Sequence, residues 1–383
     1  MSTRAFRIIS IAAALILLSG MTSAAVQTRE FAASAGGTLE LNLKAGGSVV
    51  VKGHGGSTIT VSYEIGGRTA ENSKIDFRES SGGLEIVTGY VSNSRNQSSS
   101  IDIEILVPSR FDIELDSMGG GLTIESVDGN FRGKTMGGAL VLHDVRGEAK
   151  LKTMGGNIKL TDSELDGSLE TMGGPVLFEN VIGDVTGSSM GGNVRFKNVV
   201  RRDGNVASPP RLDDVDGTMD TVQISTMGGG IDVEDAPEGA NLHTMGGDID
   251  VEDAVRFVAA KTMGGDITIQ SVDGWVKATT MGGDVDVTVT GTGGDVELIS
   301  MSGDITLVVP SGFSMEFDLE IAYTRGSSQD YQIITDQEVK QQVTGEWDYD
   351  HGSPRKYIRG SGTVGGGANR IKIRTVNGNI KIR

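Results

Sequence analysis

The sequence predicts an all-β protein that folds as a right-handed, single-stranded parallel β-helix (a β-solenoid) with about 18 residues per coil. The first observation is a Thr-Met-Gly-Gly tetrad, or a near copy of it, that recurs in two series with a spacing of 18 residues. Its methionines are Met118, Met136, Met154, Met172 and Met190, followed by Met227, Met245, Met263 and Met281, with Met301 after a further 20. The second observation is the composition, because 57 glycines against 7 prolines favour tight turns between short strands.

Each repeat unit contains two short stretches in which apolar and polar residues alternate with the period of a β-strand. In the unit of Met263, Ile267 and Ile269 mark the first stretch, and Val276 and Ala278 mark the second. A turn such as "VDG" at 127–129 separates the two stretches, and Asp-Gly suits a positive φ there. Neither strand buries its apolar face alone, so successive units are expected to stack in parallel ladders about 4.8 Å apart. Parallel crossovers are overwhelmingly right-handed.

The chain begins with a predicted export signal at residues 1–25. Arg4 and Arg7 precede an apolar run, and "TSAA" offers a cleavage site after Ala24 or Ala25. Met21 stands where a lipoprotein needs Cys, so lipid attachment is not expected there. We therefore expect the mature chain in the periplasm, secreted or at the cell surface, with no later segment apolar enough to span a membrane.

Four further sections follow, and they differ in how closely they keep the repeat. They are irregular N-terminal coils (26–116), the regular tetrad repeat (117–322), a polar excursion or lid (323–364) and a final basic coil (365–383). Within the regular section, 37 residues separate Met190 from Met227, which predicts about two coils with "SPP" (208–210) in place of one tetrad. In the final coil, Val376 takes the place of the methionine.

A family resemblance is carried by "VPSRFDIELDSMGGGLTIESVDG" at 107–129, by the iterated "GGNIKL" and "GGDITI", and by the closing "TVNGNIKI". On these stretches the chain resembles the putative-adhesin family of bacterial β-strand-repeat proteins, a domain of unknown function. It is also similar to the head domain of putative autotransporter adhesins. The resemblance covers nearly all of the mature chain, implies a right-handed β-helix in the bacterial envelope, and brings no catalytic residues with it.

The tetrad itself is open to several interpretations. We expect the methionine to point inward and fill corners of the core, and the preceding Thr, such as Thr153, to form an outward ladder. An alternative is that stacked thioethers bind Cu(I), because soft ligands select that ion. An outward Thr row also raises ice binding as a minor alternative. The two glycines are expected at a corner where a Cβ would clash.

Acidic residues form a column directly after the glycine pairs. This column holds Asp248, Asp266, Asp284 and Asp304, and a second one, two residues on, holds Asp232, Asp250 and Asp286. Like charges about 4.8 Å apart raise carboxylate pKa values or attract cations. One hypothesis is therefore a Ca²⁺ column at Asp248, Asp266, Asp284 and Asp250, since carboxylate oxygens are calcium ligands. The other is a solvated face that keeps the rod soluble.

The C-terminal part offers two further surfaces. The excursion carries Tyr323, Tyr331, Trp347 and Tyr349, which form either a binding surface for a sugar or partner or a lid that covers the open end of the solenoid. Residues 354–383 contain eight Lys or Arg and no acidic residue. Such a basic end suggests head-to-tail association with the acidic rod, or docking on an anionic envelope polymer.

Composition favours binding over catalysis. The net charge of −17 disfavours nucleic acid, which needs a basic surface, and the absence of Cys excludes thiolate chemistry. The four histidines, His54, His143, His243 and His351, are scattered. We predict an exported, non-enzymatic, adhesin-like binding or scaffolding surface in the bacterial cell envelope, with an envelope glycan or protein as partner and no cofactor beyond the Ca²⁺ considered above. The alternative is a polysaccharide-active lyase or hydrolase on the same β-helix fold.

Overall fold

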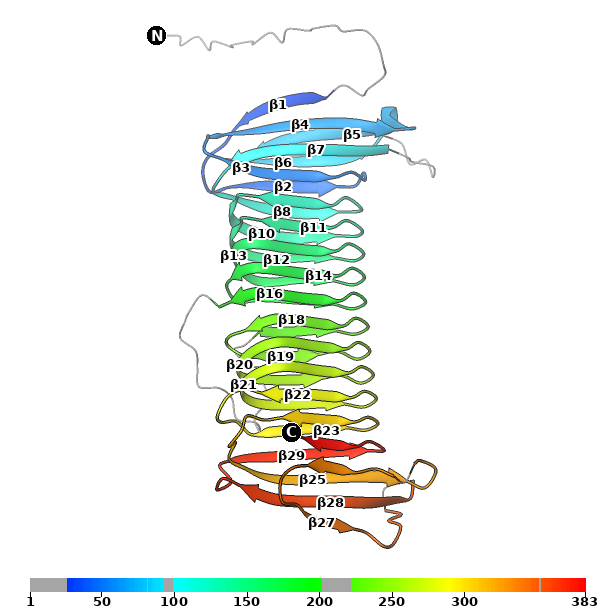
Figure 1. Ribbon diagram of the computed structural model, residues 1–383. Helices are drawn as coiled ribbons and strands as arrows, with labels where there is room; N and C mark the ends of the chain where they lie inside the picture. Colours follow the sequence, from blue (N-terminus) through cyan, green and yellow to red (C-terminus); the bar gives the residue numbers. More distant parts are fainter. Residues whose placement is uncertain (1–25, 81, 92–98, 202–221, 329, 351–352) are drawn as a thin grey trace, which may run out of the picture.

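In the computed structural model, the chain forms an elongated rod of stacked β-strands (Figure 1). The structure describes residues 26–80, 82–91, 99–201, 222–328, 330–350 and 353–383. The predicted export signal, the "SPP" stretch and His351 therefore lie outside the described residues. In the described part there is no α-helix, so no helix is long and apolar enough to cross a membrane. The all-β, solenoid-like architecture predicted from the repeat is confirmed.

The strands fall into three sections along the chain. The N-terminal section holds β1 (Gln27–Ala32), β2 (Gly37–Leu43), β3 (Val49–His54), β4 (Thr58–Gly67), the 3-10 turn η1 (Ala70–Asn72), β5 (Ser73–Ser80), β6 (Gly83–Tyr90) and β7 (Ser99–Pro108). The repeat section holds β8 (Phe111–Ser117), β9 (Leu122–Glu125), β10 (Asp128–Thr135), β11 (Leu140–His143), β12 (Arg146–Thr153), β13 (Ile158–Thr171), β14 (Val176–Ile182), β15 (Val185–Ser189), β16 (Val194–Val200), β17 (Val222–Thr226), β18 (Ile231–Ala236), β19 (Ala240–His243), β20 (Ile249–Lys261), β21 (Ile267–Thr280), β22 (Val285–Val289), β23 (Val296–Ser300) and β24 (Ile305–Val308). The C-terminal section holds β25 (Met315–Thr324), β26 (Ile333–Thr335), β27 (Lys340–Val343), β28 (Arg355–Val364), β29 (Asn369–Val376) and β30 (Ile380–Ile382).

The repeat section is built from two parallel ladders, one for each stretch of the repeat unit. In the ladder of second stretches, Phe131 of β10 pairs with Ala149 of β12, and in the other ladder Leu140 of β11 pairs with Ile158 of β13. Both pairs join residues 18 positions apart, so one repeat unit makes one layer. The inward side chains of the layers merge into one apolar cluster that runs from Leu39 to Ile382.

The interval between Met190 and Met227 holds one layer, so the prediction of two coils is wrong. Gly187 of β15 pairs directly with Ile224 of β17, and Val194 of β16 pairs with Ile231 of β18. The backbone N–H of Gly228 also donates to the carbonyl of Met190 at 2.9 Å. Sequence spacing alone does not distinguish an additional layer from residues inserted between two layers that remain paired.

The tetrad is oriented opposite to the prediction, because its methionine points outward and its threonine inward. The ten tetrad methionines are between 39 and 60% exposed, whereas Thr153 is fully buried. The physical reason is the alternation of the second strand, in which Ala149 and Leu151 point inward. The period of two then places Thr153 inside and Met154 outside. The prediction that the methionines fill the core is therefore wrong.

Inside the rod, the threonines form a polar ladder that joins each layer to the previous one. The Thr153 hydroxyl donates to the Gly138 carbonyl of the preceding layer at 2.8 Å and accepts from the Gly156 N–H at 3.2 Å. The same donation to the preceding layer is made by Thr135, Thr171, Ser189, Thr226, Thr244, Thr262, Thr280, Ser300 and Thr375. These buried hydroxyls are thus satisfied. A buried row of hydroxyl groups cannot contact ice, so the ice-binding alternative is excluded.

The second glycine of the tetrad is required by close stacking of the corners. A Cβ at Gly156 would lie 2.1 Å from the Gly138 carbonyl oxygen, while one at Gly155 would meet nothing closer than 3.7 Å. Neither glycine has a positive φ. The corner therefore needs the missing Cβ of Gly156 for the approach of two layers and not for a left-handed backbone.

In the layer of the first "VDG", the left-handed residue of the turn between the two strands lies two positions before the Asp of the predicted Asp-Gly pair. Ser126, just before "VDG", has φ of 56°, and no positive φ occurs at Asp128 or Gly129. Equivalent residues of the next layers are also left-handed, namely Asp144, Asp162, Asn180 and Asn198. Asn and Asp tolerate this conformation because a short polar side chain can hydrogen-bond locally. In the second "VDG", at 272–274, Gly274 does have a positive φ, of 153°.

Both ends of the rod are closed by strands that leave the parallel repeat (Figure 1). At the N-terminal end, β6 and β7 stack outside β2 and β3, while β4 pairs antiparallel to β7 and β1 pairs antiparallel to β4. At the other end, β29 lies between β23 and β25, and β28 and β27 continue the sheet antiparallel. The sections 26–116 and 365–383 are therefore not simply successive coils. The last coil keeps the predicted register, with Ile380 beside Ile305, but is not the last layer.

Candidate binding surfaces

The exposed methionines form one continuous ladder along a corner of the rod, here called the methionine ladder. Its members are Met118, Met136, Met154, Met172, Met190, Met227, Met245, Met263, Met281 and Met301. Backbone hydrogen bonds hold them in register; for example, the N–H of Met154 donates to the carbonyl of Thr135 at 3.1 Å, and that of Met301 to Thr280 at 3.2 Å. In the neighbouring layers, Lys44 and Val376 take the methionine position, so the ladder has two defined ends.

The first acidic column is hydrogen-bonded from layer to layer by backbone amides. The Oδ1 atom of Asp248 accepts from the N–H of Asp266 at 2.9 Å, and Asp266 accepts from Asp284 at 2.8 Å. The series continues from Asp284 to Asp304 at 2.7 Å and ends on Asn379. Each carboxylate thus caps the strand start of the next layer. Among the described residues, no group of three or more His, Asp or Glu side chains is arranged to hold a metal ion, and the calcium column stays a prediction.

The second acidic column is interrupted. Asp232 pairs with Asp250, which pairs with Thr268, and Thr268 in turn pairs with Asp286. The pKa of Asp250 is raised by burial and by the charges of its neighbours Asp232 and Asp248. This is the direction that stacked carboxylates were expected to show. Asp232 is also bound by the guanidinium of Arg195, whose Nε lies at 2.9 Å.

Three of the four aromatic residues of the predicted binding surface come together, and the fourth stands apart. Tyr323 is 7% exposed, and its ring centroid lies 6.3 Å from that of Tyr331 and 6.1 Å from that of Trp347. The Trp347 face is approached by Lys356 at 5.1 Å. These rings pack on the core, as a lid does. Tyr349 is 62% exposed and is the member of this set that is free to meet a ligand.

The basic residues of the last coil are paired with acids of adjacent layers. Lys372 lies 2.6 Å from Glu297, and Arg370 lies 2.9 Å from Asp295. Because β29 lies between β23 and β25, these charges sit within the rod and not at its tip. They neutralise neighbouring acids. Arg355, Lys356 and Arg359 of the same basic stretch lie instead in β28, at the C-terminal end of the rod, and head-to-tail association stays a prediction.

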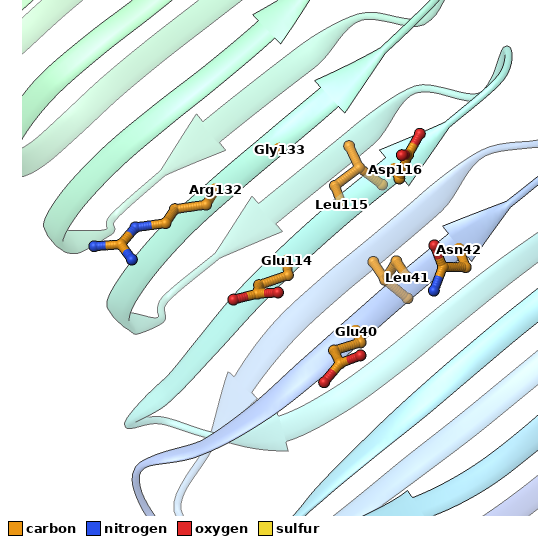
Figure 2. Close-up of a pocket in the computed structure, with 8 residues that line it drawn as sticks. All are labelled: Glu40, Leu41, Asn42, Glu114, Leu115, Asp116, Arg132 and Gly133. Carbon is orange, nitrogen blue, oxygen red and sulfur yellow. The ribbon is translucent and has the colours of Figure 1, made fainter.

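A surface hollow that sequence reasoning missed lies over β2, β8 and β10. Figure 2 shows its outward side chains, among them Glu40, Glu114 and Arg132 in successive strands. Glu40 stands opposite Glu114, which stands opposite Arg132. The juxtaposition depends on β2 pairing with β8, strands whose paired residues are 74 positions apart in the chain. No repeat spacing indicates that pairing.

The histidines do not converge on this hollow or on one another within the described chain. His54, His143 and His243 lie in β3, β11 and β19, three different layers. His54 contacts the Thr58 carbonyl at 2.8 Å, and His143 contacts the Thr161 hydroxyl at 3.0 Å. Each of these two rings is thus engaged in a local hydrogen bond.

Residues 178–383, just over half of the chain, match the Toastrack DUF4097 family. The chain belongs to this family. The matched region runs from β14 to the C-terminus and so includes the last six methionines of the ladder, the acidic columns and the C-terminal section. The Toastrack DUF4097 domain is one of unknown function, so membership supplies no ligand and no catalytic residue. No curated protein sequence matches the chain.

Three solved structures are similar to the chain at low identity. They are a putative cell adhesion protein from Clostridium sporogenes ATCC 15579 (10% identity, 94% of this chain and 99% of that one, TM-score 0.17), a putative adhesin from Bacteroides fragilis NCTC 9343 (11%, 94% and 98%, TM-score 0.27) and a putative adhesin from Parabacteroides distasonis ATCC 8503 (10%, 72% and 98%, TM-score 0.28). At these TM-scores the likeness carries no argument about this chain.

Proposed function

We propose that this Toastrack protein is an exported, non-enzymatic, right-handed β-solenoid that acts as an adhesin-like binding or scaffolding surface in the bacterial envelope. One observation carries the proposal: a continuous core runs through all layers, and strands outside the repeat close both ends. Such a rod presents the same outward positions layer after layer at a spacing of about 4.8 Å. Extended solenoid surfaces of this kind serve to bind partners.

An envelope glycan or an envelope protein is the partner class that fits this surface. Tyr349 is exposed on the C-terminal section, and an exposed ring is a platform on which a sugar or a protein side chain packs. The buried Tyr323 supports the closure of the rod end instead. A glycan array probed with the full chain and with Tyr349→Ala tests this role. Reduced retention for the variant is expected, and equal retention of a bound glycan would remove Tyr349 from the binding surface.

A second candidate function is the cleavage of a polysaccharide, and the hollow of Figure 2 is the observation that favours it. Glu40 and Glu114 are neighbouring carboxylates with Arg132 beside them, a combination that can serve acid–base chemistry on a sugar. A turnover assay on every retained glycan separates the two functions. We expect no new reducing ends; release that is abolished by Glu114→Gln would replace the binding proposal with the enzymatic one.

Export is tested separately by expressing the full chain with a C-terminal epitope in a Gram-negative host. We expect a processed product outside the cytoplasm that begins at residue 25 or 26. An intact N-terminus in the cytoplasmic fraction would contradict this part of the proposal, and it would leave the binding assays unaffected.

A further inference from the structure

The methionine is the member of the tetrad that the fold does not explain. The threonine is buried and joins two layers, and the second glycine admits the carbonyl of the preceding layer. The methionine side chain, by contrast, is 39–60% exposed in every layer of the ladder, so core packing does not require it. A polar side chain would suit an exposed corner at least as well. Ten occurrences of one apolar, sulfur-bearing residue at this position therefore call for a ligand.

The surroundings leave the thioethers accessible. Next to nine of the ten ladder methionines stands the first glycine of the pair, such as Gly155, which is exposed and carries no side chain; Ser302 follows Met301. A Cβ there would make ordinary contacts, at 3.7 Å for Gly155, so stacking does not demand this glycine either. Its effect is to leave open space beside the sulfur. The corner thus combines a repeated thioether with a repeated gap.

The spacing of the ladder matches the geometry of a bridging metal ion. Hydrogen bonds between layers place consecutive methionine backbones one strand spacing apart, about 4.8 Å. A metal–sulfur bond measures about 2.3 Å, as for zinc and thiolate, so two such bonds in line span about 4.6 Å. Two neighbouring thioethers can therefore hold one ion between them with small rotations of their flexible side chains. An ion that accepts two or three sulfur ligands in this way is a soft, monovalent one.

From this geometry we infer that the methionine ladder is a binding site for soft monovalent cations, Cu(I) or Ag(I), held between thioethers of adjacent layers. The chain contains no Cys, so the thioethers are its soft sulfur ligands. Thioethers do not take up protons in the physiological range, and binding is therefore expected to be constant between about pH 5 and 8, unlike binding to His or Cys. The inference is independent of the adhesin-like role, because it concerns a different surface from Tyr349.

Two variants with five Met→Leu substitutions each give a matched test, because Leu conserves the volume and the apolar character. The block variant replaces Met227, Met245, Met263, Met281 and Met301, and keeps five adjacent methionines. The alternating variant replaces Met136, Met172, Met227, Met263 and Met301, so that no two remaining methionines are neighbours. The buried Met315→Leu and the exposed His243→Gln serve as controls, since Met315 lies in the core and His243 precedes the ladder residue Met245 by two positions.

Silver(I) is the first probe, followed through the ¹³C-labelled methionine methyl signals, and Cu(I) is measured under anaerobic conditions against a chromophoric chelator. We expect the full chain to bind up to about five ions, the block variant about half as many, and the alternating variant at least about tenfold more weakly. Both controls should bind like the full chain. Equal binding by the block and alternating variants would overturn the bridging geometry, and unchanged binding by both, or none by the full chain, would overturn the site.

Discussion

The most direct test of how this rod is built is a pair of alanine substitutions in adjacent glycines, Gly155→Ala and Gly156→Ala. At Gly156 the new Cβ would lie 2.1 Å from the Gly138 carbonyl oxygen and 2.3 Å from its carbon. The first distance is about 0.9 Å short of the 3.0 Å below which real Cβ atoms are essentially never found. That oxygen also accepts the hydroxyl hydrogen bond of Thr153. The substitution therefore forces two layers apart at the point where they are joined.

The cost follows from two contributions. Separation of the layers weakens the hydrogen bonds from Thr153 to Gly138 and from Gly156 to Thr153, each contributing about 1 kcal/mol net. Overpacking at a site that cannot relax adds about 1–3 kcal/mol. We expect Gly156→Ala to lower the free energy of unfolding by about 3–5 kcal/mol. Gly155→Ala meets its nearest atom at 3.7 Å without a positive φ, and should stay within about 1 kcal/mol of the wild type.

Urea unfolding followed by circular dichroism measures the global effect, and amide hydrogen exchange locates it. In a solenoid each layer contacts its neighbours, so faster exchange is expected in β11, β12 and β13 and not in β2 or β3. Equal stability of the two alanine variants would refute the argument that close approach at the second glycine is what the tetrad encodes. So would a loss of protection spread evenly along the rod.

Three further predictions address the interior, the acidic surface and the lid. Thr153→Val removes a buried hydroxyl with two partners and should cost about 1–3 kcal/mol in urea unfolding; a neutral effect would mean that the threonine ladder does not hold the layers. The pKa of Asp250 is raised in the folded state, chiefly by burial. The folded chain therefore binds the carboxyl proton of Asp250 more tightly than the unfolded chain does. As a result, the folded state loses stability as the pH rises from the ordinary carboxyl range through the raised pKa. Asp250→Asn should therefore melt at a higher temperature than the wild type at pH 7, with the gain vanishing in acid below the ordinary range; a gain independent of pH would contradict the sign. Tyr323→Ala should cost about 3–5 kcal/mol, as for other large buried rings, whereas Tyr349→Ala should stay within about 0.5 kcal/mol, and similar losses for both would disprove the division between lid and exposed ring.

The sequence was sufficient to predict what depends on the period of the repeat. A spacing of 18 residues with two alternating stretches implies two ladders, and Ile267, Ile269, Val276 and Ala278 are all buried as expected. The same alternation also determines which residue of the tetrad is buried, although the prediction placed the methionine inside. The alternation through Val276 and Ala278 continues to Thr280, so the parity of the strand already indicated which of Thr280 and Met281 points inward.

The ends of the rod were beyond prediction for a different physical reason. A layer is identified from sequence by its distance to the next one, but β29 pairs with β23 across 75 residues and β2 pairs with β8 across 74. These strand pairings cover sheet edges that would otherwise be open at the two ends of the rod. Which strands cover an edge depends on the tertiary structure and not on the local sequence pattern. The outermost strands meet it by being short or polar: β27 reads "KQQV" and is exposed throughout. The hollow at Glu40 and Glu114 exists because of such a pairing and is therefore invisible to the repeat.

The contacts of a repeated side chain distinguish a residue that the fold requires from a residue that binds a ligand. Thr153 donates a hydrogen bond to the preceding layer, and Gly156 leaves room for the carbonyl of that layer, so both have a contact in the fold that accounts for their repetition. Met154 repeats equally well, yet it is 43% exposed. In the layers at which the ladder ends, the same position holds Lys44 and Val376 while the strands remain paired and in register. Since those layers form without the methionine, the fold does not select it, and selection must act through what binds to the outer surface.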